Sequence, residues 1–209
     1  MREGEIKTNN LIITGVGGQG NVLAARLLGE TAISEGYDVS IGDIFGLSQR
    51  GGSVASHVRW TTKGKCIAPI VPRFSLNILI GFEPLDALRI LTKYGSPKTV
   101  AIVNEKPIVP IGVQAGRFSY PDTDELLDGI KGLTKTLLVV DASTLAIKLG
   151  NIKVVNMIML GALAGSSFSM LHKDSFIKVI EERFSGEILE INLRAFQEGY
   201  KLVIDMVNQ

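Results

Sequence analysis

The first part of the chain alternates between apolar runs and polar turns in the order of a wound α/β sheet. Residues 11–14 are apolar and β-branched, which predicts a short buried strand. Residues 21–35 carry apolar side chains at helical spacing, and Gly36 stands where a helix would end. Residues 37–41 predict a second strand. A strand, a glycine-rich turn, a helix and a strand in this order are typical of the start of a doubly wound sheet.

The middle of the chain adds further strand patterns. Residues 42–52 predict a loop, whereas residues 53–60 alternate in polarity, as a half-buried or edge strand does. Pro84 after Glu83 predicts the start of a helix, with Glu83 either capping that helix or contacting a ligand at the strand end. Three apolar runs predict buried strands at residues 76–82, 99–104 and 136–141.

Helical spacing dominates the remainder, from about residue 142. In one of these segments, Gly161 and Gly165 predict that a helix packs closely, either in the core or against a partner. No repeat or linker divides the chain firmly. We therefore expect one domain over residues 1–209, an α/β, Rossmann-like three-layer sandwich with a mostly parallel sheet and a helical C-terminal portion. The predicted helices of that portion are 143–149, 154–164, 174–184 and 192–207.

Charge and composition narrow the classes of function. The 209 residues carry a net charge of +1 and the basic residues are spread along the chain, which argues against a nucleic-acid groove or an anionic membrane partner. The apolar runs are too short to span a bilayer and the N-terminus has no apolar signal segment, so a cytoplasmic location is expected. With Cys66 the only cysteine and two distant histidines, the chain alone is not expected to hold a metal or an iron–sulfur cluster.

The GVGGQG segment that follows the first predicted strand is the main candidate for binding chemistry. Gly15 permits a tight turn, Gly17 lets a ligand approach the backbone, and Gly20 lets the helix pack against the strand. Gly18 and Gln19 add flexibility and an amide side chain. The helix N-terminus that follows offers unpaired N–H groups and a partial positive charge. The segment therefore predicts either an anion or nucleotide site or a purely structural turn.

A nicotinamide-dependent enzyme would combine this turn with an acidic residue at the end of the second strand. Asp43, 23 positions after Gly20, is the candidate. The rest of the chain is short for a substrate domain, and His57, within a strand, is more readily structural than catalytic. A stand-alone NAD(P)-binding oxidoreductase therefore remains the alternative function.

A second candidate segment precedes the alternating strand. Its arginine offers a planar fork suited to phosphate or carboxylate, and its two glycines allow positive φ angles. The other interpretation is a turn whose arginine is solvated or paired with Asp43. The segment consists of Gln49, Arg50, Gly51, Gly52 and Ser53.

Taken together, these motifs resemble the γ-type subunit family of 2-oxoacid:ferredoxin oxidoreductases, and indolepyruvate-type members in particular. The resemblance rests on GVGGQG at residues 15–20, SQRGGSVASHVRW at 48–60 and FEPLDALR at 82–89. It extends to Asn156 in a predicted helix and to EINLRAFQEGY at 190–200, so that it covers nearly the whole chain. Three spaced motifs are far more specific than any one of them.

The resemblance implies a subunit that is catalytically incomplete by itself. Enzymes of this family convert a 2-oxoacid, coenzyme A and oxidised ferredoxin into an acyl-CoA, carbon dioxide and reduced ferredoxin. Thiamine diphosphate and iron–sulfur clusters are held by a larger partner subunit, and coenzyme A is a co-substrate. The glycine turn and Arg50 would line an anion-binding crevice at the junction with that partner. Whether the isolated chain is a monomer or a homodimer is left open.

One position departs from the family pattern. Indolepyruvate-type relatives commonly carry a histidine before the glycine that corresponds to Gly46, and this chain has Phe45. The substrate can therefore be an aryl-pyruvate such as indolepyruvate or another 2-oxoacid.

Overall fold

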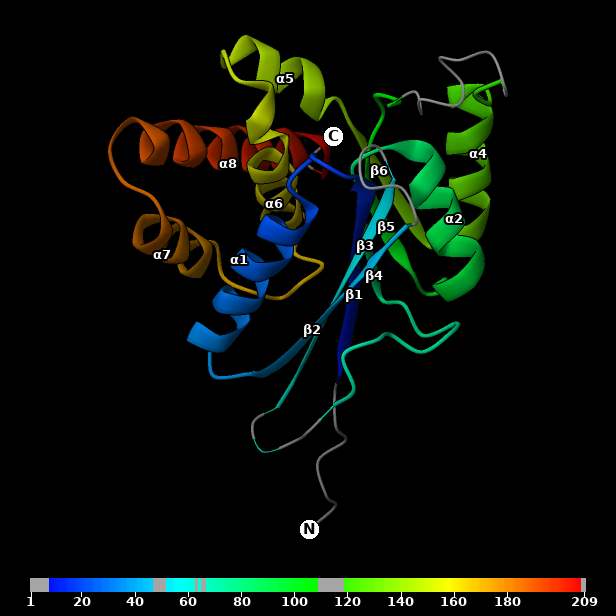
Figure 1. Cartoon of the computed structure of the whole chain (residues 1–209), viewed down its shortest axis with the longest axis horizontal. Helices are drawn as coiled ribbons and strands as arrows, with labels where there is room; N and C mark the ends of the chain where they lie inside the picture. Colours follow the sequence, from blue (N-terminus) through cyan, green and yellow to red (C-terminus); the bar gives the residue numbers. More distant parts are fainter. Residues whose placement is uncertain (1–7, 47–51, 63, 65–66, 109–118, 208–209) are drawn as a thin grey trace.

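The computed structural model describes residues 8–46, 52–62, 64, 67–108 and 119–207, and it forms three layers (Figure 1). A six-stranded sheet in the order β2-β3-β1-β4-β5-β6 makes the middle layer. Helices α1, α6, α7 and α8 lie on one side of the sheet, and α2 and α4 lie on the other. The strands are β1 (Asn9–Val16), β2 (Asp38–Phe45), β3 (Ser53–Thr61), β4 (Ile78–Gly81), β5 (Val100–Asn104) and β6 (Thr136–Val140).

Most helices follow the predicted pattern, whereas the helix over residues 123–133 was not predicted and the last helix begins at Gly186 instead of residue 192. Helix α1 ends before Gly36, whose φ of 87° confirms the predicted helix stop. Glu83 caps the helix that begins at Pro84, which confirms the capping interpretation. The helices are α1 (Asn21–Ser34), α2 (Pro84–Tyr94), α4 (Thr123–Leu133), α5 (Ala142–Lys148), the short η1 (Ile152–Val154), α6 (Val155–Ser166), α7 (Lys173–Arg183) and α8 (Gly186–Val207).

Two expectations for the first strands were wrong. The predicted loop at 42–52 begins later, because β2 continues to Phe45 and pairs with β3 from Asp38↔Thr61 to Phe45↔Val54. Strand β3 is neither half-buried nor at an edge: it lies between β2 and β1, antiparallel to both, and nearly all of it is buried. Helix α1 covers one face of β3, while Val71 contacts His57 on the other, so its alternating polar residues are buried as well.

The other strand pairs give the sheet its mostly parallel character. β1 pairs with β4, β4 with β5, and β5 with β6, all in parallel. Their carboxyl ends therefore meet along one edge of the sheet, which is the edge where open α/β sheets bind ligands. No helix in the described part of the chain is long and apolar enough to cross a membrane.

Helices α6 and α8 pack with their backbones in direct contact. A Cβ atom at Gly161 would overlap the Phe196 carbonyl, and one at Gly199 would overlap the Ile158 carbonyl. These glycines therefore allow α6 and α8 to pack against each other within the core. Of the two alternatives expected for this helix, packing in the core is confirmed. Because α6 belongs to the same hydrophobic cluster as β1 and α1, the helix pair also sets the position of the layer behind the glycine turn.

We predict that Gly199→Ala destabilises the chain by at least about 1–3 kcal/mol, since the added methyl group meets backbone atoms that cannot move aside. The free energy of unfolding from denaturant titration measures this. Gly132→Ala in α4 is the matched control, because no atom lies within 4 Å of the added methyl group. Equal stability of the two variants would contradict the close packing of α6 and α8.

Candidate functional site

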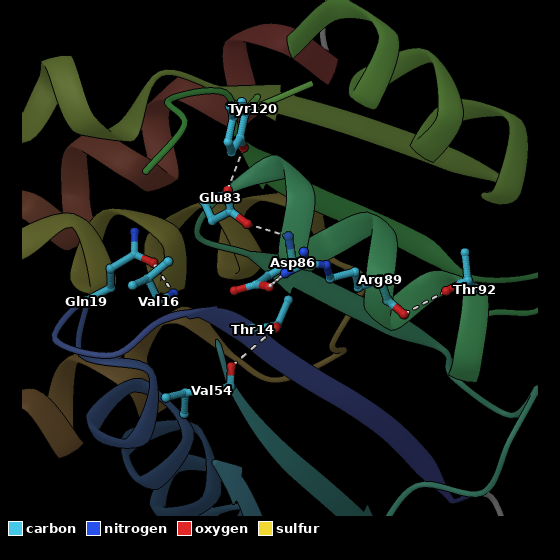
Figure 2. Close-up of polar contacts among 9 residues, drawn as sticks. All are labelled: Thr14, Val16, Gln19, Val54, Glu83, Asp86, Arg89, Thr92 and Tyr120. Carbon is cyan, nitrogen blue, oxygen red and sulfur yellow. Dashed lines mark hydrogen bonds and ion pairs between the residues drawn. The ribbon is translucent and has the colours of Figure 1, made fainter. Parts of the chain in front are cut away.

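The candidate site lies where the carboxyl ends of β1, β4 and β5 meet the N-termini of helices. β1 leads into the glycine turn, β4 into Phe82 and Glu83, and β5 ends at Asn104. Figure 2 shows the polar side chains at the ends of the first two of these strands, with Gln19 on one side and Glu83, Asp86 and Tyr120 on the other.

The glycine turn is held by its own residues and by the strand ends beside it. Gly15 still belongs to β1, and a Cβ atom there would lie 2.8 Å from that of Phe82, so only glycine fits. Gly17 donates its N–H to the Gly52 carbonyl at 2.9 Å. Gly18 has a φ of 104° with open space around it. The structure thus brings the turn and the end of the second candidate segment together.

Gly20 has a different role from the one expected. It is the N-cap of α1 with a φ of 84°, and a Cβ atom there would lie 2.6 Å from Nδ2 of Asn156. The glycine therefore permits contact with helix α6 rather than with the strand. Asn156 is buried, and its Oδ1 accepts from the N–H of Met157.

Gln19 uses both ends of its side chain inside the protein. Its Oε1 accepts from the Val16 N–H at 2.7 Å, and its Nε2 donates to the Phe82 carbonyl at 3.0 Å. Asn104 also donates to the Phe82 carbonyl, at 3.1 Å, and its amide contacts Ser143 of α5. Gln19 therefore holds the turn in place instead of reaching for a ligand. Asn104 was not singled out by the sequence, although a polar residue at the end of an apolar strand run was the available signal.

The helix N-termini at this edge differ in how they are capped. Glu83 caps α2 by accepting from the Asp86 N–H, and Asp141 caps α5 by accepting from the Thr144 N–H at 3.0 Å. Helix α1 has no side-chain cap. Among these three helices, α1 alone keeps its first N–H groups and its positive dipole end free of a protein carboxylate, which suits a bound anion.

Asn21, the first residue of α1, adds a further polar group at the turn. Its side chain is only 3% exposed, and its Oδ1 has no hydrogen-bond partner among the described residues. The same oxygen lies 3.3 Å from the Cβ position of Gly15. A buried acceptor without a partner is rare in folded proteins, and here it stands beside the turn.

Only part of the second candidate segment can be placed. Gln49, Arg50 and Gly51 lie outside the described residues. Gly52 accepts the hydrogen bond from Gly17, and the Ser53 carbonyl accepts from the Gly46 N–H at 2.8 Å.

Two buried acidic residues and a tyrosine complete the site, and the sequence singled out only one of them. Glu83 and Asp86 are 2% and 3% exposed, and the Tyr120 hydroxyl donates to Glu83 at 2.7 Å. Burial raises the pKa of Glu83 above its ordinary value, against the hydrogen bonds from Tyr120 and the Asp86 N–H. Burial also raises the pKa of Asp86, against Arg89 and a hydrogen bond from Ser53. Burial and Glu83 together raise the pKa of Tyr120, which keeps it a hydrogen-bond donor.

Asp43 does not stand where a nicotinamide site would need it. In the expected order the second strand would lie beside β1, but β3 is inserted between them, which places β2 about 9–10 Å from β1. Asp43 lies opposite Ser56 of β3 and accepts a hydrogen bond from its hydroxyl. The Asp43 carboxylate is therefore bound to a neighbouring strand of the sheet, and strand β3 separates it from the glycine turn.

His57 is a core residue. It is fully buried in β3, its Nδ1 accepts from the Val71 N–H at 3.2 Å, and its ring meets that of Tyr94 edge to face. Burial, reinforced by the charges of Lys93 and Arg59 and opposed by Asp43, lowers its pKa to about 4. It is therefore neutral at physiological pH, and it does not reach the glycine turn.

The arrangement is suited to holding and orienting a ligand. Backbone N–H groups and a helix dipole face the turn, and the described residues contain no group of three or more metal-binding side chains. The fold defines a Rossmann-like α/β protein whose glycine turn lies at the carboxyl edge of the sheet, where open α/β sheets bind ligands.

Comparison with known proteins gives the family. The family model for pyruvate ferredoxin/flavodoxin oxidoreductase matches residues 10–202, and the chain belongs to this family. It is 34% identical over 204 residues to indolepyruvate oxidoreductase subunit IorB of Thermococcus kodakarensis, covering 97% of this chain and 99% of that protein.

Two solved structures share the fold. The γ subunit of a keto/oxoacid ferredoxin oxidoreductase from Geobacter sulfurreducens matches with a TM-score of 0.67 and 20% identity, covering 94% of this chain and 99% of that one. The 2-oxoglutarate:ferredoxin oxidoreductase from Magnetococcus marinus, with 2-oxoglutarate, coenzyme A and succinyl-CoA bound, matches with a TM-score of 0.71 and 20% identity. That match covers 97% of this chain and 32% of the larger one.

We predict that Gly20→Ala destabilises the chain more than Gly36→Ala does. Both glycines have φ near +85°, so each alanine variant should lose about 1–2 kcal/mol from backbone strain. Only Gly20 adds the clash with Asn156, since no atom lies within 4 Å at Gly36. Denaturant unfolding compares the two, and Asn156→Ala should recover part of the excess in the Gly20→Ala background. Equal losses at the two glycines would contradict the contact with α6.

We predict that stability falls as the pH drops from about 6.5 to about 4, partly because of His57. The unfolded chain takes up a proton on this imidazole in that range and the folded chain does not. His57→Gln should therefore flatten the dependence of the melting temperature on pH within the window. His172→Gln, at the exposed position of the other histidine, is the control. An unchanged slope in His57→Gln would show that the imidazole is not held neutral.

Proposed function

We propose that the chain is the accessory subunit of a 2-oxoacid:ferredoxin oxidoreductase and supplies an anion-binding element for coenzyme A. The reaction is the oxidative decarboxylation of a 2-oxoacid to an acyl-CoA with reduction of ferredoxin. The observation that carries the proposal is the uncapped N-terminus of α1 at the glycine turn, at an edge where α2 and α5 are closed by their own carboxylates.

The chemistry of the anion fits what the turn offers. A phosphate or pyrophosphate group gains from unpaired backbone N–H groups and from the helix dipole, and it needs no proton transfer from the protein. The hydrogen bond from Gly17 to Gly52 brings the end of the second candidate segment to the turn. On the sequence, Arg50 of that segment is proposed to add its charge to the site. The contribution of the chain is positioning of the co-substrate.

The redox chemistry belongs to a larger partner in this proposal. Thiamine diphosphate held there would supply the chemistry of the decarboxylation, and iron–sulfur clusters held there would supply electron transfer to ferredoxin. The family assignment supports this division, because the indolepyruvate relative is named as one subunit of its enzyme. We place the complex in the cytoplasm. Whether two copies of this chain pair within it is decided by the mass of the purified complex.

The nicotinamide alternative is not favoured. It requires Asp43 beside the turn, whereas β3 separates the two, and the family assignment points to a ferredoxin-linked enzyme. Titration of the chain with NAD should therefore give no saturable binding, and saturable binding lost in Asp43→Ala would restore the alternative.

The substrate is proposed to be a 2-oxoacid of the aryl-pyruvate type. The relative at 34% identity supports this choice. Phe45, 63% exposed at the end of β2, stands four positions before Gln49 and pairs with Val54, next to Ser53, so it offers an apolar surface beside the end of the second candidate segment. Comparison of several 2-oxoacids with the purified complex tests the choice directly.

We predict that Gly17→Asp raises the KM for coenzyme A at least about tenfold in the complex purified anaerobically through a tagged chain. The added carboxylate would stand at the positive end of α1 and repel a phosphate. Steady-state ferredoxin reduction at varied coenzyme A concentration measures the change. Gly17→Asn is the control, because it adds a side chain of the same size without the charge. An unchanged KM in Gly17→Asp would place coenzyme A elsewhere.

A further inference from the structure

We propose that Glu83 and Asp86 are positioning residues of the anion site. They hold Tyr120 and Ser53 by charge-assisted hydrogen bonds. Through Ser53, Asp86 fixes the segment at 52–53 against the glycine turn, and Glu83 fixes the end of β4, where the Phe82 carbonyl accepts from Gln19. The inference rests on the proposed function, because it assigns these carboxylates a role in the affinity of that same site.

The first arm of this arrangement, meaning the first carboxylate and the hydroxyl group that it binds, is Glu83 with Tyr120. Glu83 follows β4 directly, and its two carboxylate oxygens have separate partners. One accepts from the Asp86 N–H at the start of α2, and the other accepts from the Tyr120 hydroxyl at 2.7 Å. Tyr120 lies 37 positions further along the chain, just before α4, so Glu83 ties two distant segments together (Figure 2).

The second arm is Asp86 with Ser53. The Asp86 carboxylate lies on the first turn of α2, where Arg89 contacts it from the solvent side at 3.2 Å. On its other side a hydrogen bond from Ser53 favours the ionised form. Ser53 is the first residue of β3 and comes directly after the QRGG segment.

These arms continue into the glycine turn through the backbone. Gly52, next to Ser53, accepts from the N–H of Gly17 at 2.9 Å. Phe82, next to Glu83, accepts from the side chain of Gln19 at 3.0 Å. Each acidic residue therefore acts within a few bonds of the turn, but neither contacts the space over the N-terminus of α1 itself.

The burial of both carboxylates argues for a role beyond capping. Removing a charge from water is unfavourable, and a glutamine or asparagine of the same shape would keep an acceptor oxygen without that penalty. At helix α4 the capping carboxylate avoids this cost, because Asp122 is exposed to solvent. A fold that needed only a cap at α2 would be more stable with a neutral side chain there. Paired residues with perturbed ionisation are concentrated at functional sites.

The negative charge of the two carboxylates strengthens their hydrogen bonds to the hydroxyl groups of Tyr120 and Ser53. A hydrogen bond to a carboxylate is roughly twice as strong as one between neutral groups. The hydrogen bond to Asp86 holds the Ser53 side chain in one orientation. It thereby keeps the neighbouring Gly52 carbonyl in its hydrogen bond with the Gly17 N–H. The remaining N–H groups of the turn then stay aligned for a phosphate group before it arrives.

The first experiment measures how the stability of the wild type and of the Glu83→Gln chain depends on pH. The melting temperature of the Glu83→Gln chain should exceed that of the wild type, and the difference should grow as the pH rises above the ordinary pKa of a glutamate, because burial raises the pKa of Glu83 in the folded chain only. The charged and titratable groups that face the pair are Tyr120, Arg89 and each other. Asp122→Asn is the control and should not raise the melting temperature at any pH.

The second experiment measures positioning in the purified complex. Glu83→Gln and Tyr120→Phe should each raise the KM for coenzyme A on the order of threefold to tenfold, with the KM for the 2-oxoacid unchanged. The double variant should show no larger a change than either single one, because each single variant already removes the charge-assisted hydrogen bond between Tyr120 and Glu83. Asp86→Asn and Ser53→Ala form a second cycle with the same expectation.

The outcomes separate this inference from the proposed function. If Gly17→Asp raises the KM for coenzyme A while both cycles leave it unchanged, or if their effects add, the carboxylates are structural caps and the inference is wrong. If Gly17→Asp has no effect, the proposed function fails and the inference fails with it. A lower melting temperature for Glu83→Gln at about pH 8 would also overturn it, since the charge would then serve stability.

Discussion

The site depends on a single carbonyl oxygen, that of Phe82, which accepts hydrogen bonds from the side chains of both Gln19 and Asn104. Through Gln19 this oxygen fixes the glycine turn to the end of β4, and through Asn104 it fixes β5 and α5 to the same point. Only a glycine at position 15 leaves room for this contact. The geometry of the turn is therefore set by the neighbouring strands as well as by its own sequence.

The insertion of β3 between β2 and β1 decides which chemistry the turn can support. In a dinucleotide fold the second strand lies beside the first and brings its acid to the ribose. Here β3 takes that place, carries no acidic residue, and begins with Ser53 beside the turn. The glycine turn therefore lacks the neighbouring acid that a dinucleotide site needs, although its spacing is the same.

Much of the fold could be predicted from the sequence, because helical periodicity and caps are local signals. Gly36, Pro84 and the spacing in 21–35 marked two helices correctly. The position of β3 could not be predicted, since alternating polarity looks the same in an edge strand and in an inner strand covered by a loop on one face. The glycine turn was found from its spacing and Glu83 from its place before a proline. Asp86, Asn104 and Tyr120 were missed because their partners are brought to them by the tertiary fold, as Ser53, Phe82 and Glu83 are.

The electrostatic environment differs between the helix N-termini along the sheet edge. At the β4 side, the dipole of α2 is already satisfied by Glu83 and Asp86, and at the β6 side Asp141 closes α5. An external anion would meet carboxylates at both of these places and would meet no capping side chain at α1. Because like charges within a few ångströms repel, the acids disfavour a phosphate at the N-termini of α2 and α5. Among these three helices, α1 is therefore the one whose N-terminus no capping carboxylate opposes.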